Sequence, residues 1–576
     1  MAAEIYMPKN GMDMTEGTLI RWLKEVGDPV TEGEAIMEIE TDKVTMEAEA
    51  PASGILLQKL YEDGAVVPVL STLGYIAPPG EELPPAPSPA PAYQSAEHAA
   101  AEEPLTYQTA VIGGGPAGYV AAIRAAQLGA RVILFEKDTV GGTCLNRGCI
   151  PTKALLKTAS CLRRIKHAAA HGIRISGAVE ADLPSIMANK NRIVQTLTNG
   201  VSSLLCSNGV KVVKGDARLI SPHQITCCGS LYSAEKIILC GGAAAVRPPI
   251  PGADHDRVLT STELLNLQDL PRSLCVIGGG VIGCELASAF RAFGAEVVIV
   301  EQTERLVPAM DPEVSAEVKR AMEEDGITLH LRERVQQIVE QDGQLTVVTD
   351  TSQIPCDVVL LSAGRAANLE CLGELREQLR TEGGRIVVDD TMKTSIDNIY
   401  ACGDINGRAM LAHTAFKMGR IAAENCVRGD RSPCHLNAVP SVLYTLPEAA
   451  SVGLTEPQAR ERYPSGVLTG RFPLSANGRS VAAGETAGFV KVLADSATGE
   501  LLGVHIVGDS ASEMIAEPAA LMAAEVTIHE IASQFIHAHP SCAEAFAEAC
   551  ADALNSCIHL PPKRQKPQQD SLPQTL

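Results

Sequence analysis

The sequence has 576 residues, 45% of them hydrophobic, and a formal net charge of −21. A chain of this length predicts a multidomain globular protein with roughly three to five domains. The charge is uneven, because residues 1–104 hold 5 Lys and Arg against 19 Asp and Glu and so carry −14 of the total. This acidic balance argues against a nucleic-acid partner.

Membrane spans, export signals and metal sites are not predicted. No apolar run reaches the roughly 18 residues that a membrane span needs, and residues 1–10 lack the basic and apolar regions of a signal peptide. The 17 cysteines are scattered and include no zinc-type CxxC pair, which favours reduced thiols over a disulfide framework. We therefore expect a soluble, cytoplasmic protein without a metal site.

Residues 1–77 predict a small all-β domain. Short alternating strands are broken by glycines, and residues 17–28 resemble residues 54–65, which indicates two similar half-sheets. Between these repeats, an alternating segment places Asp42 and Lys43 at a hairpin tip, where a lysine is open to modification. The pattern resembles the lipoyl domains of 2-oxoacid dehydrogenase complexes, and this resemblance implies a flattened β-barrel with lipoate attached to Lys43.

A biotin carrier is the alternative for this domain. Biotin carriers have Met on both sides of the modified lysine, whereas Lys43 lies between Asp42 and Val44. We therefore expect lipoate rather than biotin.

Residues 78–104 are nearly all Pro, Ala, Glu and Ser. This composition lacks the large apolar groups that a core needs and predicts a flexible linker. Its Pro-rich part favours polyproline II, at about 3 Å per residue, and so gives the tethered domain a long reach.

Residues 109–137 read as an apolar strand, a glycine-rich turn, an amphipathic helix and a second strand that ends in an acid. This order is the Rossmann fingerprint of a dinucleotide site. Gly113 permits the tight turn, Gly115 lets the backbone approach a pyrophosphate, and Gly118 allows close helix packing. Glu136 is placed to accept hydrogen bonds from ribose hydroxyls.

A second fingerprint occupies residues 274–302, with Gly278, Gly280, Gly283 and the terminal acid Glu301. Two nucleotide cofactors are therefore expected. A carboxylate at this last position binds the diol of the adenosine ribose but repels a 2′-phosphate, and no Arg pair stands after it. NAD is expected rather than NADP.

The segment Ala-Cys-Gly-Asp at residues 401–404 indicates which cofactor takes which site. It resembles the aspartate segment that closes over the flavin ribityl chain in two-dinucleotide flavoproteins, and the first fingerprint continues directly into a cysteine motif. This resemblance implies FAD in the first site, with Asp404 at the ribityl chain, and NAD in the second.

Cys144 and Cys149 are separated by four residues and precede a run of residues that favour a helix. Such a pair can form a disulfide across about one helical turn. Because the closed loop is small, the bond adds little entropic stabilisation, whereas a reducible disulfide beside a flavin is chemically useful. We therefore predict a redox-active disulfide.

Near the end of the chain, His539 precedes Glu544 by five residues. Sulfur chemistry needs an imidazole that deprotonates an incoming thiol and a carboxylate that orients this imidazole. We predict that His539 and Glu544 are this base and its partner.

The cysteine motif resembles the active-site motif of the pyridine nucleotide-disulfide oxidoreductases, and the resemblance extends over residues 109–562. It implies that Cys144 exchanges with substrate, while Cys149 faces the isoalloxazine and forms a charge-transfer thiolate. It also implies that Lys153 lies near flavin N5 and pairs with Glu285.

The same resemblance implies a homodimer, because the segment with His539 comes from the partner subunit in this family. The further FAD contacts that it implies are Lys137, Gly142, Thr143, Lys153, Gly215, Asp216, Gly242 and Ala412. The further NAD contacts are Val281, Ile282, Val335, Gly364 and Arg365.

The predicted architecture is an all-β lipoyl-type barrel, then an α/β flavoprotein with two Rossmann-like dinucleotide-binding domains, and a C-terminal α+β dimerisation domain. The expected boundaries are 1–77 for the lipoyl domain, 78–104 for the linker, 105–255 for the first part of the FAD-binding domain, 256–375 for the NAD-binding domain, 376–437 for the second FAD-binding or central part, 438–562 for the dimerisation domain and 563–576 for a disordered tail.

Residues 439–448 and 472–478 resemble the interface domain of the dihydrolipoyl dehydrogenases in particular. This resemblance implies NAD⁺-dependent oxidation of protein-bound dihydrolipoamide in a 2-oxoacid dehydrogenase complex, with lipoyl domains and the acyltransferase core as partners. The sequence leaves open whether that complex acts on pyruvate, 2-oxoglutarate, branched-chain 2-oxoacids, acetoin or glycine.

Three alternatives fit less well. Mercuric reductases share the cysteine motif, but their metal-binding N-terminal domain and C-terminal cysteine pair are missing here. Glutathione reductase is disfavoured by Glu301, which disfavours NADPH. A carrier protein with an inert flavoprotein part is the alternative from another class, and the intact cysteine pair, base and nucleotide motifs argue against it.

Overall fold

The computed structural model describes residues 3–7, 16–40, 45–68, 71–77 and 106–562. The chain divides into two compact units, residues 1–102 and residues 103–576. Each unit has hydrophobic clusters of its own.

The described part of the first unit is all-β, as predicted. Its strands form two antiparallel sheets, ordered β1-β8-β6-β3 and β5-β4-β2-β7, and the two sequence repeats supply one strand to each, β2 and β6. Fully buried side chains from both sheets, Ile36 and Leu56 among them, form one core. The strands are β1 (Ala3–Tyr6), β2 (Glu16–Trp22), β3 (Pro29–Val30), β4 (Ala35–Glu40), β5 (Thr45–Glu49), β6 (Gly54–Lys59), β7 (Val66–Pro68) and β8 (Thr72–Ala77). Lys43 and the predicted linker and tail lie outside the described residues.

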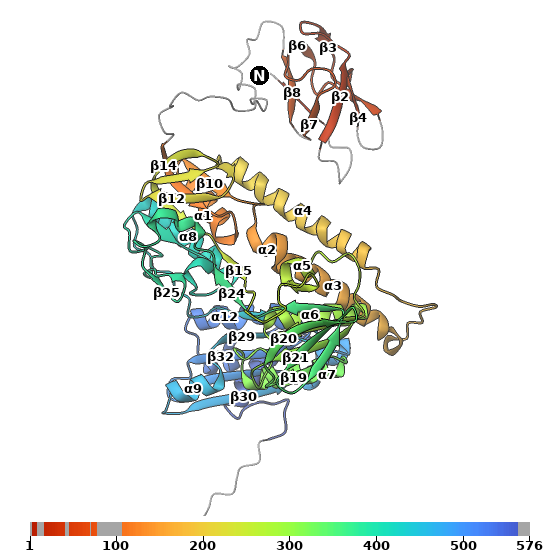
Figure 1. The fold of residues 1–576 in the computed structure, drawn as a ribbon, viewed down its shortest axis with the longest axis vertical. Helices are drawn as coiled ribbons and strands as arrows, with labels where there is room; N and C mark the ends of the chain where they lie inside the picture. Colours follow the sequence, from red (N-terminus) through yellow and green to blue (C-terminus); the bar gives the residue numbers. More distant parts are fainter. Residues whose placement is uncertain (1–2, 8–15, 41–44, 69–70, 78–105, 563–576) are drawn as a thin grey trace, which may run out of the picture. The chain divides into compact units, whose positions relative to one another are not determined.

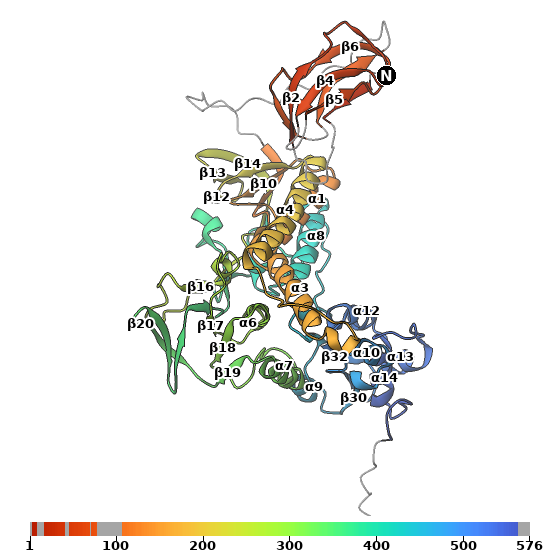
Figure 2. The same ribbon diagram turned by 90° about the vertical axis from the view of Figure 1, so that its right-hand side faces the viewer.

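The second unit begins with the sheet of the first fingerprint, ordered β11-β10-β9-β14-β13-β12. Strand β10 and the second half of β9 are largely apolar and buried, as parallel strands covered on both faces are. Strand β27, far along the chain, pairs in parallel with β14, and α8 lies beside α1 (Figures 1 and 2), so two distant segments build one domain. The elements are β9 (Thr106–Ile112), α1 (Pro116–Gln127), β10 (Val132–Glu136), α2 (Gly142–Arg147), α3 (Cys149–Lys166), α4 (Leu183–Ser207), β11 (Lys211–Lys214), β12 (Ala217–Ser221), β13 (Gln224–Cys227), β14 (Ser230–Leu239), β27 (Ile399–Ala401) and α8 (Ala412–Arg428).

The second fingerprint forms a parallel five-stranded sheet, ordered β16-β23-β17-β18-β19. Helix α6 comes after β17 and contributes buried residues to the largest core of this unit. The elements are β15 (Ala243–Ala245), β16 (Val258–Thr260), α5 (Ser261–Leu264), β17 (Ser273–Ile277), α6 (Val281–Phe293), β18 (Glu296–Glu301), α7 (Pro312–Glu324), β19 (Thr328–Leu331), β20 (Val335–Gln341), β21 (Gln344–Thr349), β22 (Gln353–Cys356), β23 (Val358–Leu361), β24 (Arg365–Ala367), β25 (Thr381–Glu382) and β26 (Arg385–Ile386).

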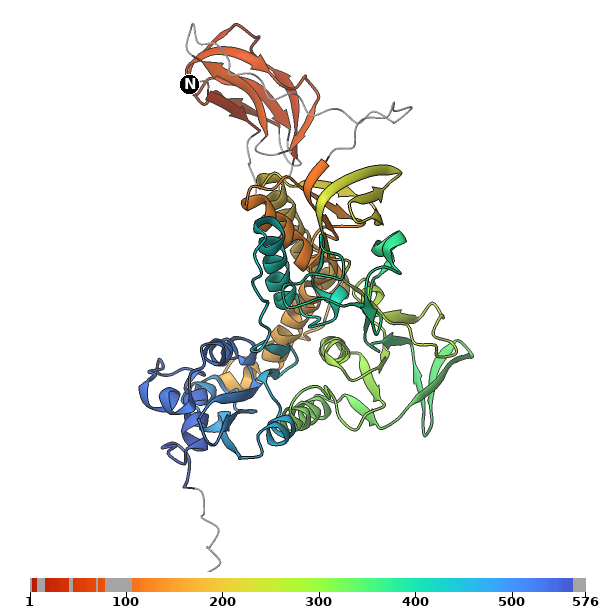
Figure 3. The ribbon, with the colours of Figure 1, turned by 90° about the vertical axis from the view of Figure 1, so that its left-hand side faces the viewer.

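The C-terminal part is an antiparallel sheet, ordered β28-β29-β32-β31-β30, with α14 packed on β30 and β31. Figure 3 shows it in blue beside the green part that holds the second fingerprint, and helix α7 of that part packs against β32. This α+β part completes the predicted fold class. Its elements are β28 (Ser441–Leu443), β29 (Glu448–Gly453), α9 (Glu456–Arg462), β30 (Val467–Pro473), α10 (Gly478–Ala483), β31 (Phe489–Asp495), β32 (Leu501–Gly508), α11 (Ala511–Met514), α12 (Ala516–Ala523), α13 (Ile528–Gln534) and α14 (Glu544–Ala553).

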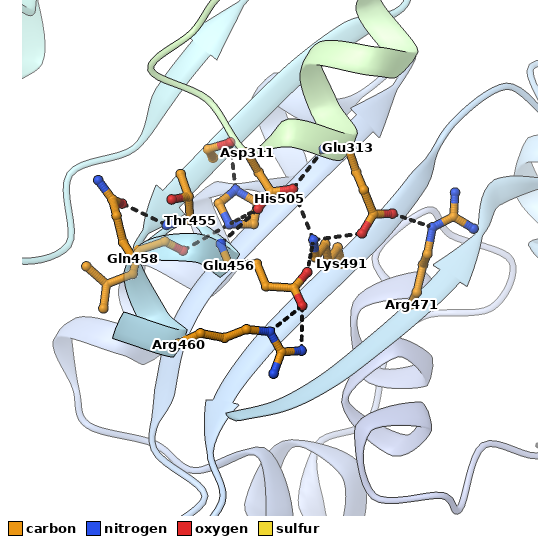
Figure 4. A network of polar contacts seen from close by, with 11 residues as sticks. Asp311, Glu313, Thr455, Glu456, Gln458, Arg460, Arg471, Lys491 and His505 are labelled. Atoms are coloured by element: carbon orange, nitrogen blue, oxygen red, sulfur yellow. Dashed lines mark hydrogen bonds and ion pairs between the residues drawn. The ribbon is translucent and has the colours of Figure 1, made fainter. Parts of the chain in front are cut away.

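A buried lysine joins the part with the second fingerprint to the C-terminal part (Figure 4). Lys491 of β31 is 1% exposed, and its Nζ lies 3.0 Å from Asp311 and 2.7 Å from Glu313, at the start of α7. The same Nζ lies 2.6 Å from Glu456 at the start of α9. Burial lowers the pKa of Lys491, but hydrogen bonds to the three carboxylates outweigh burial and raise it. The charged ammonium therefore fixes α7 on the C-terminal sheet.

Replacing this lysine is expected to destabilise the protein strongly. The substitution Lys491→Met leaves the fully buried Asp311 without its cation, and losing one partner of a buried ion pair costs about 3–5 kcal/mol. Arg320→Met is the control, because Arg320 pairs with Glu317 and Glu324 on the exposed face of α7, where a pair contributes about 0–1 kcal/mol. Urea unfolding measures both variants, and equal losses would contradict the role of Lys491.

Candidate active site

The first glycine-rich turn builds an anion site at the start of α1. Gly115 caps the helix and Pro116 is its first residue, so the first-turn N–H groups have no partner within the helix. No acidic side chain stands in that turn, which leaves the helix N-terminus open to a pyrophosphate. The N–H groups of Gly114 and Asp138 donate to the Glu136 carboxylate at 2.7 and 2.9 Å. These donors hold the carboxylate in place while it keeps acceptor capacity for ribose hydroxyls.

The second turn repeats this arrangement at the start of α6. The N–H groups of Gly279 and Thr303 each donate to Glu301 at 2.7 Å. A Cβ on Gly283 would lie 2.1 Å from the carbonyl oxygen of Gly278, and the equivalent clash at Gly118 in the first turn would be 1.7 Å. Glycine is therefore required where each helix packs on its strand, and both donor sets fit a dinucleotide.

A cavity of about 180 Å³ lies at the N-terminus of α6. Its lining residues are Ala245, Ser261, Gly280, Val281, Ile282, Leu361, Ser362, Gly364 and Arg365, five of which are predicted NAD contacts. The cavity adjoins the second glycine-rich turn, where a dinucleotide would bind. A larger hollow of about 570 Å³ between α4 and β11 is lined by none of the predicted site residues.

Cys144 and Cys149 lie on two consecutive helices. Cys144 is in α2, Cys149 is the first residue of α3, and Gly148 between them has non-helical backbone angles. The pair thus spans a helix break, not the single helical turn expected from the spacing. The break places Cys149 at the positive end of the α3 dipole, which favours a thiolate.

The two thiols differ in acidity in the dithiol form that the structure shows. A hydrogen bond with the Cys144 thiol, aided by the charge of Lys153, lowers the pKa of Cys149 to about 7 and outweighs partial desolvation. The same hydrogen bond, together with burial, raises the pKa of Cys144 well above its ordinary value. Of the two thiols, Cys149 is therefore the one that loses its proton first, while Cys144 keeps its proton.

Lys153 lies one turn after Cys149 and reaches from α3 to α6. Its Nζ donates to both carboxylate oxygens of Glu285, at 2.8 and 3.0 Å. The Glu285 side chain is 3% exposed, so this ion pair neutralises a charge inside the protein. The structure brings together the two residues that the sequence resemblance paired.

Arg365 of β24 lies between the two cofactor sites. Its guanidinium donates to the carbonyl of Ala243 and to Thr143 Oγ1 (3.4 Å), and it lies 4.0 Å from Asp404. Burial raises the pKa of Asp404, and the charge of Arg365 opposes this shift. Arg365 was predicted as an NAD contact only, and its contacts with two predicted FAD residues were missed because no local spacing signals them.

His539 and Glu544 form the predicted pair. His539 Nδ1 lies 2.8 Å from Glu544 Oε1, and the N–H of Ser541 donates to Oε2 at 2.8 Å. Burial raises the pKa of Glu544, but the hydrogen bonds from Ser541 and His539 outweigh it and lower the pKa. The carboxylate thus orients the imidazole and leaves Nε2 to accept a proton. Sequence reasoning missed a second pair beside it, His537 with Glu517 at 2.8 Å.

The base and the cysteines do not meet within the described part of one chain, where no hydrogen bond joins His539 to Cys144 or Cys149.

The other predicted contacts lie at the ends of elements. The N–H of Gly215 donates to the carbonyl of Glu136 at 2.9 Å, which brings the end of β11 to the first site. Lys137 comes directly after β10, Gly142 and Thr143 begin α2, Asp216 precedes β12, Gly242 precedes β15, Ala412 begins α8 and Val335 begins β20.

Membrane spans and metal clusters are both absent from the described ranges. No helix there is long and apolar enough to span a membrane, and no three His, Cys, Asp or Glu side chains are grouped as metal ligands.

A dithiol between two dinucleotide-binding folds defines the class of flavoprotein disulfide oxidoreductases. Residues 107–419 match the family model described as pyridine nucleotide-disulphide oxidoreductase, and residues 439–550 match the dimerisation domain of that family. The chain belongs to the pyridine nucleotide-disulphide oxidoreductase family, whose cofactors are FAD and NAD. Residues 3–76 match a third model, described as biotin-requiring enzyme.

Curated relatives match about four fifths of the chain. The chain is 38% identical over 462 residues to a dihydrolipoyl dehydrogenase of Chlamydia pneumoniae, and the match spans 79% of this chain and 99% of that protein. It is also 38% identical over 459 residues to a dihydrolipoyl dehydrogenase of Bacillus subtilis, with 78% and 99% covered.

Solved structures agree with the fold. The HOCl-induced flavoprotein disulfide reductase RclA of Escherichia coli superposes with a TM-score of 0.71 at 30% identity, over 77% of this chain and 99% of that one. LpdA of Mycobacterium tuberculosis superposes with a TM-score of 0.72 at 27% identity, over the same shares of the two chains.

The thiolate of Cys149 is expected to titrate near neutral pH. In the dithiol enzyme, the long-wavelength absorbance of a thiolate–flavin charge-transfer pair should be lost as the pH falls through about 7, because Cys149 then takes up a proton. Lys153→Met should move the midpoint to higher pH, since the lysine charge favours the thiolate. The exposed Lys157 of the same helix is the control, and Lys157→Met should leave the midpoint in place. If Lys153→Met has the same midpoint as the wild type, the role of Lys153 in stabilising the Cys149 thiolate is contradicted.

Proposed function

We propose that this protein oxidises dihydrolipoamide to lipoamide and reduces NAD⁺. The observation that carries the proposal is the dithiol, in which Cys149 is the acidic thiol and lies one turn before the Lys153–Glu285 pair. The relatives named dihydrolipoyl dehydrogenase support this substrate. The carboxylate at Glu301 supports NAD rather than NADP.

The disulfide-exchange steps use protein side chains alone. His539 of a partner subunit takes the proton of one dihydrolipoamide thiol, and the thiolate attacks Cys144 Sγ. The Cys144–Cys149 bond breaks, Cys149 leaves as a thiolate, and the substrate is held on Cys144 as a mixed disulfide. The second substrate thiol attacks the substrate sulfur of this bond, closes the lipoyl ring and releases Cys144. The cysteine pair gains two electrons, and the two protons end on His539 and Cys144.

The cofactors would bind at the two glycine-rich turns, FAD against Gly115, Glu136 and Asp404, and NAD against Gly280 and Glu301. Bound together, they supply the transfer of the two electrons from the dithiol to NAD⁺ as a hydride. Lys153 holds a positive charge at the dithiol, and this charge would raise the electron affinity of a flavin bound there.

The first unit is proposed to be a lipoyl domain with lipoate on Lys43. The match of residues 3–76 supports a domain that carries a covalent cofactor, and the sequence Asp42-Lys43-Val44 favours lipoate over biotin. The predicted domain limits belong to this proposal. The proposal also includes a homodimer that docks to the lipoyl domains and acyltransferase core of a 2-oxoacid dehydrogenase complex. It further includes a cytoplasmic location, which is in keeping with the scattered cysteines.

The reaction is tested by measuring NADH formation from NAD⁺ and free dihydrolipoamide. Cys144→Ser should lower kcat/KM by about 10³-fold or more, because it removes the sulfur that the substrate attacks. Cys161→Ser is the control, since Cys161 is an exposed cysteine of the same α3 and should leave turnover unchanged. Turnover that survives in Cys144→Ser, or a flavin-loaded wild type without turnover, would contradict the proposal.

Lipoylation is tested separately by mass spectrometry of protein expressed with a lipoate supply. The intact chain should gain the mass of one lipoyl group, located on the peptide with Lys43. Lys43→Arg should lose this mass, whereas Lys24→Arg, two residues beyond the end of β2, should retain it. A biotinyl mass, or a lipoyl group on another lysine, would contradict the assignment.

A further inference from the structure

We propose that Tyr444 is a positioning residue for Lys153, holding the lysine ammonium through its ring and the partner Glu285 through its backbone amide. The inference rests on the proposed role of Lys153 at the flavin. Tyr444 comes directly after β28, in a segment that the sequence resemblance assigned only to the dimer interface.

The geometry closes a triangle of three residues. Lys153 Nζ lies over the Tyr444 ring, 4.5 Å from its centroid. The N–H of Tyr444 donates to Glu285 Oε1 at 3.0 Å, the same oxygen that accepts from Lys153 at 3.0 Å. Tyr444 therefore contacts both members of the ion pair, each through a different group.

A second contact on the lysine has a clear physical purpose. A lysine side chain has a flexible four-carbon stem, and one carboxylate leaves it several rotamers that satisfy the pair. The negative face of an aromatic ring attracts the ammonium from another side and restricts these rotamers. The Lys153 side chain remains 31% exposed, so these contacts do not enclose it completely.

The amide contact serves Glu285 in the same way. A buried carboxylate needs hydrogen bonds for its remaining lone pairs, and the Tyr444 N–H supplies one. Because Lys153, Glu285 and Tyr444 come from the FAD-binding, NAD-binding and C-terminal parts, the ammonium position depends on all three. A tilt of the C-terminal part would move Tyr444 and so change the position of the Lys153 ammonium beside the dithiol.

The variants Tyr444→Leu and Tyr444→Phe separate the ring from the rest of the residue. Leucine keeps the backbone N–H but has no aromatic face, whereas phenylalanine keeps that face. Tyr444→Leu should retain FAD, lower kcat roughly 3- to 10-fold with little change in KM, and raise the pH midpoint of the thiolate absorbance. Tyr444→Phe should restore both properties.

Two controls make the result specific to Lys153. Tyr107→Leu removes a comparable contact, that of Arg131 over the Tyr107 ring at 5.1 Å, and should not move the midpoint. In the background Lys153→Met, Tyr444→Leu should add no further shift, because the residue acts through the lysine.

The thiolate absorbance needs only bound flavin and a reduced dithiol, so it tests Tyr444 even if dihydrolipoamide is not the substrate. If the wild type does not turn over dihydrolipoamide but Tyr444→Leu shifts the midpoint, the proposed reaction is rejected and the role of Tyr444 stands. An unshifted midpoint in Tyr444→Leu, or a full additional shift in the Lys153→Met background, would overturn that role.

Discussion

The ion pair between Lys153 and Glu285 is the constraint on which the site depends. A carboxylate that is only 3% exposed requires a cation and hydrogen bonds, because burying an unpaired charge is costly. The cation must come from a helix that passes α6 closely, and α3 does so. Since Cys149 lies one turn before Lys153, the same contact fixes the dithiol between the two nucleotide-binding sheets. Packing energy and redox geometry thus depend on one pair.

The two cofactor sites share one design. In each, the acid at the end of the second strand accepts two backbone hydrogen bonds of 2.7 to 2.9 Å. One comes from an N–H of the glycine turn and the other from the N–H of the residue two positions after the acid. The sites differ in their surroundings, because the first leads into the cysteines, while the second opens into the small cavity at α6. Arg365 contacts two predicted residues of the first site and also lines the cavity of the second. In the proposed reaction, electrons likewise pass from the cysteines beside the first site to the NAD⁺ that would bind at the second.

Local patterns in the sequence were enough to predict both dinucleotide-binding turns and the pairing of His539 with Glu544, because each pattern lies within about thirty residues. The lipoyl-type barrel and the dimerisation domain were predicted from family resemblances. The link from Lys153 to Glu285 came from a family resemblance, as the two lie 132 positions apart. The contacts of Tyr444, Arg365 and Lys491 were not predicted. Each joins residues from different domains, and their partners are set by how finished domains pack. The helix break at Gly148 was likewise missed, since the spacing of the cysteines alone suggested a single helical turn.

The most direct test of the redox assignment is to count and locate the thiols that dihydrolipoamide creates. Oxidised, flavin-loaded protein would be treated anaerobically with one equivalent of dihydrolipoamide, unfolded in an alkylating reagent and mapped by mass spectrometry. We expect two new alkylation sites, Cys144 and Cys149, with the other cysteines labelled equally before and after treatment. New label at any other cysteine, or none at these two, would contradict the assignment of the Cys144–Cys149 disulfide as the acceptor of the substrate's electrons.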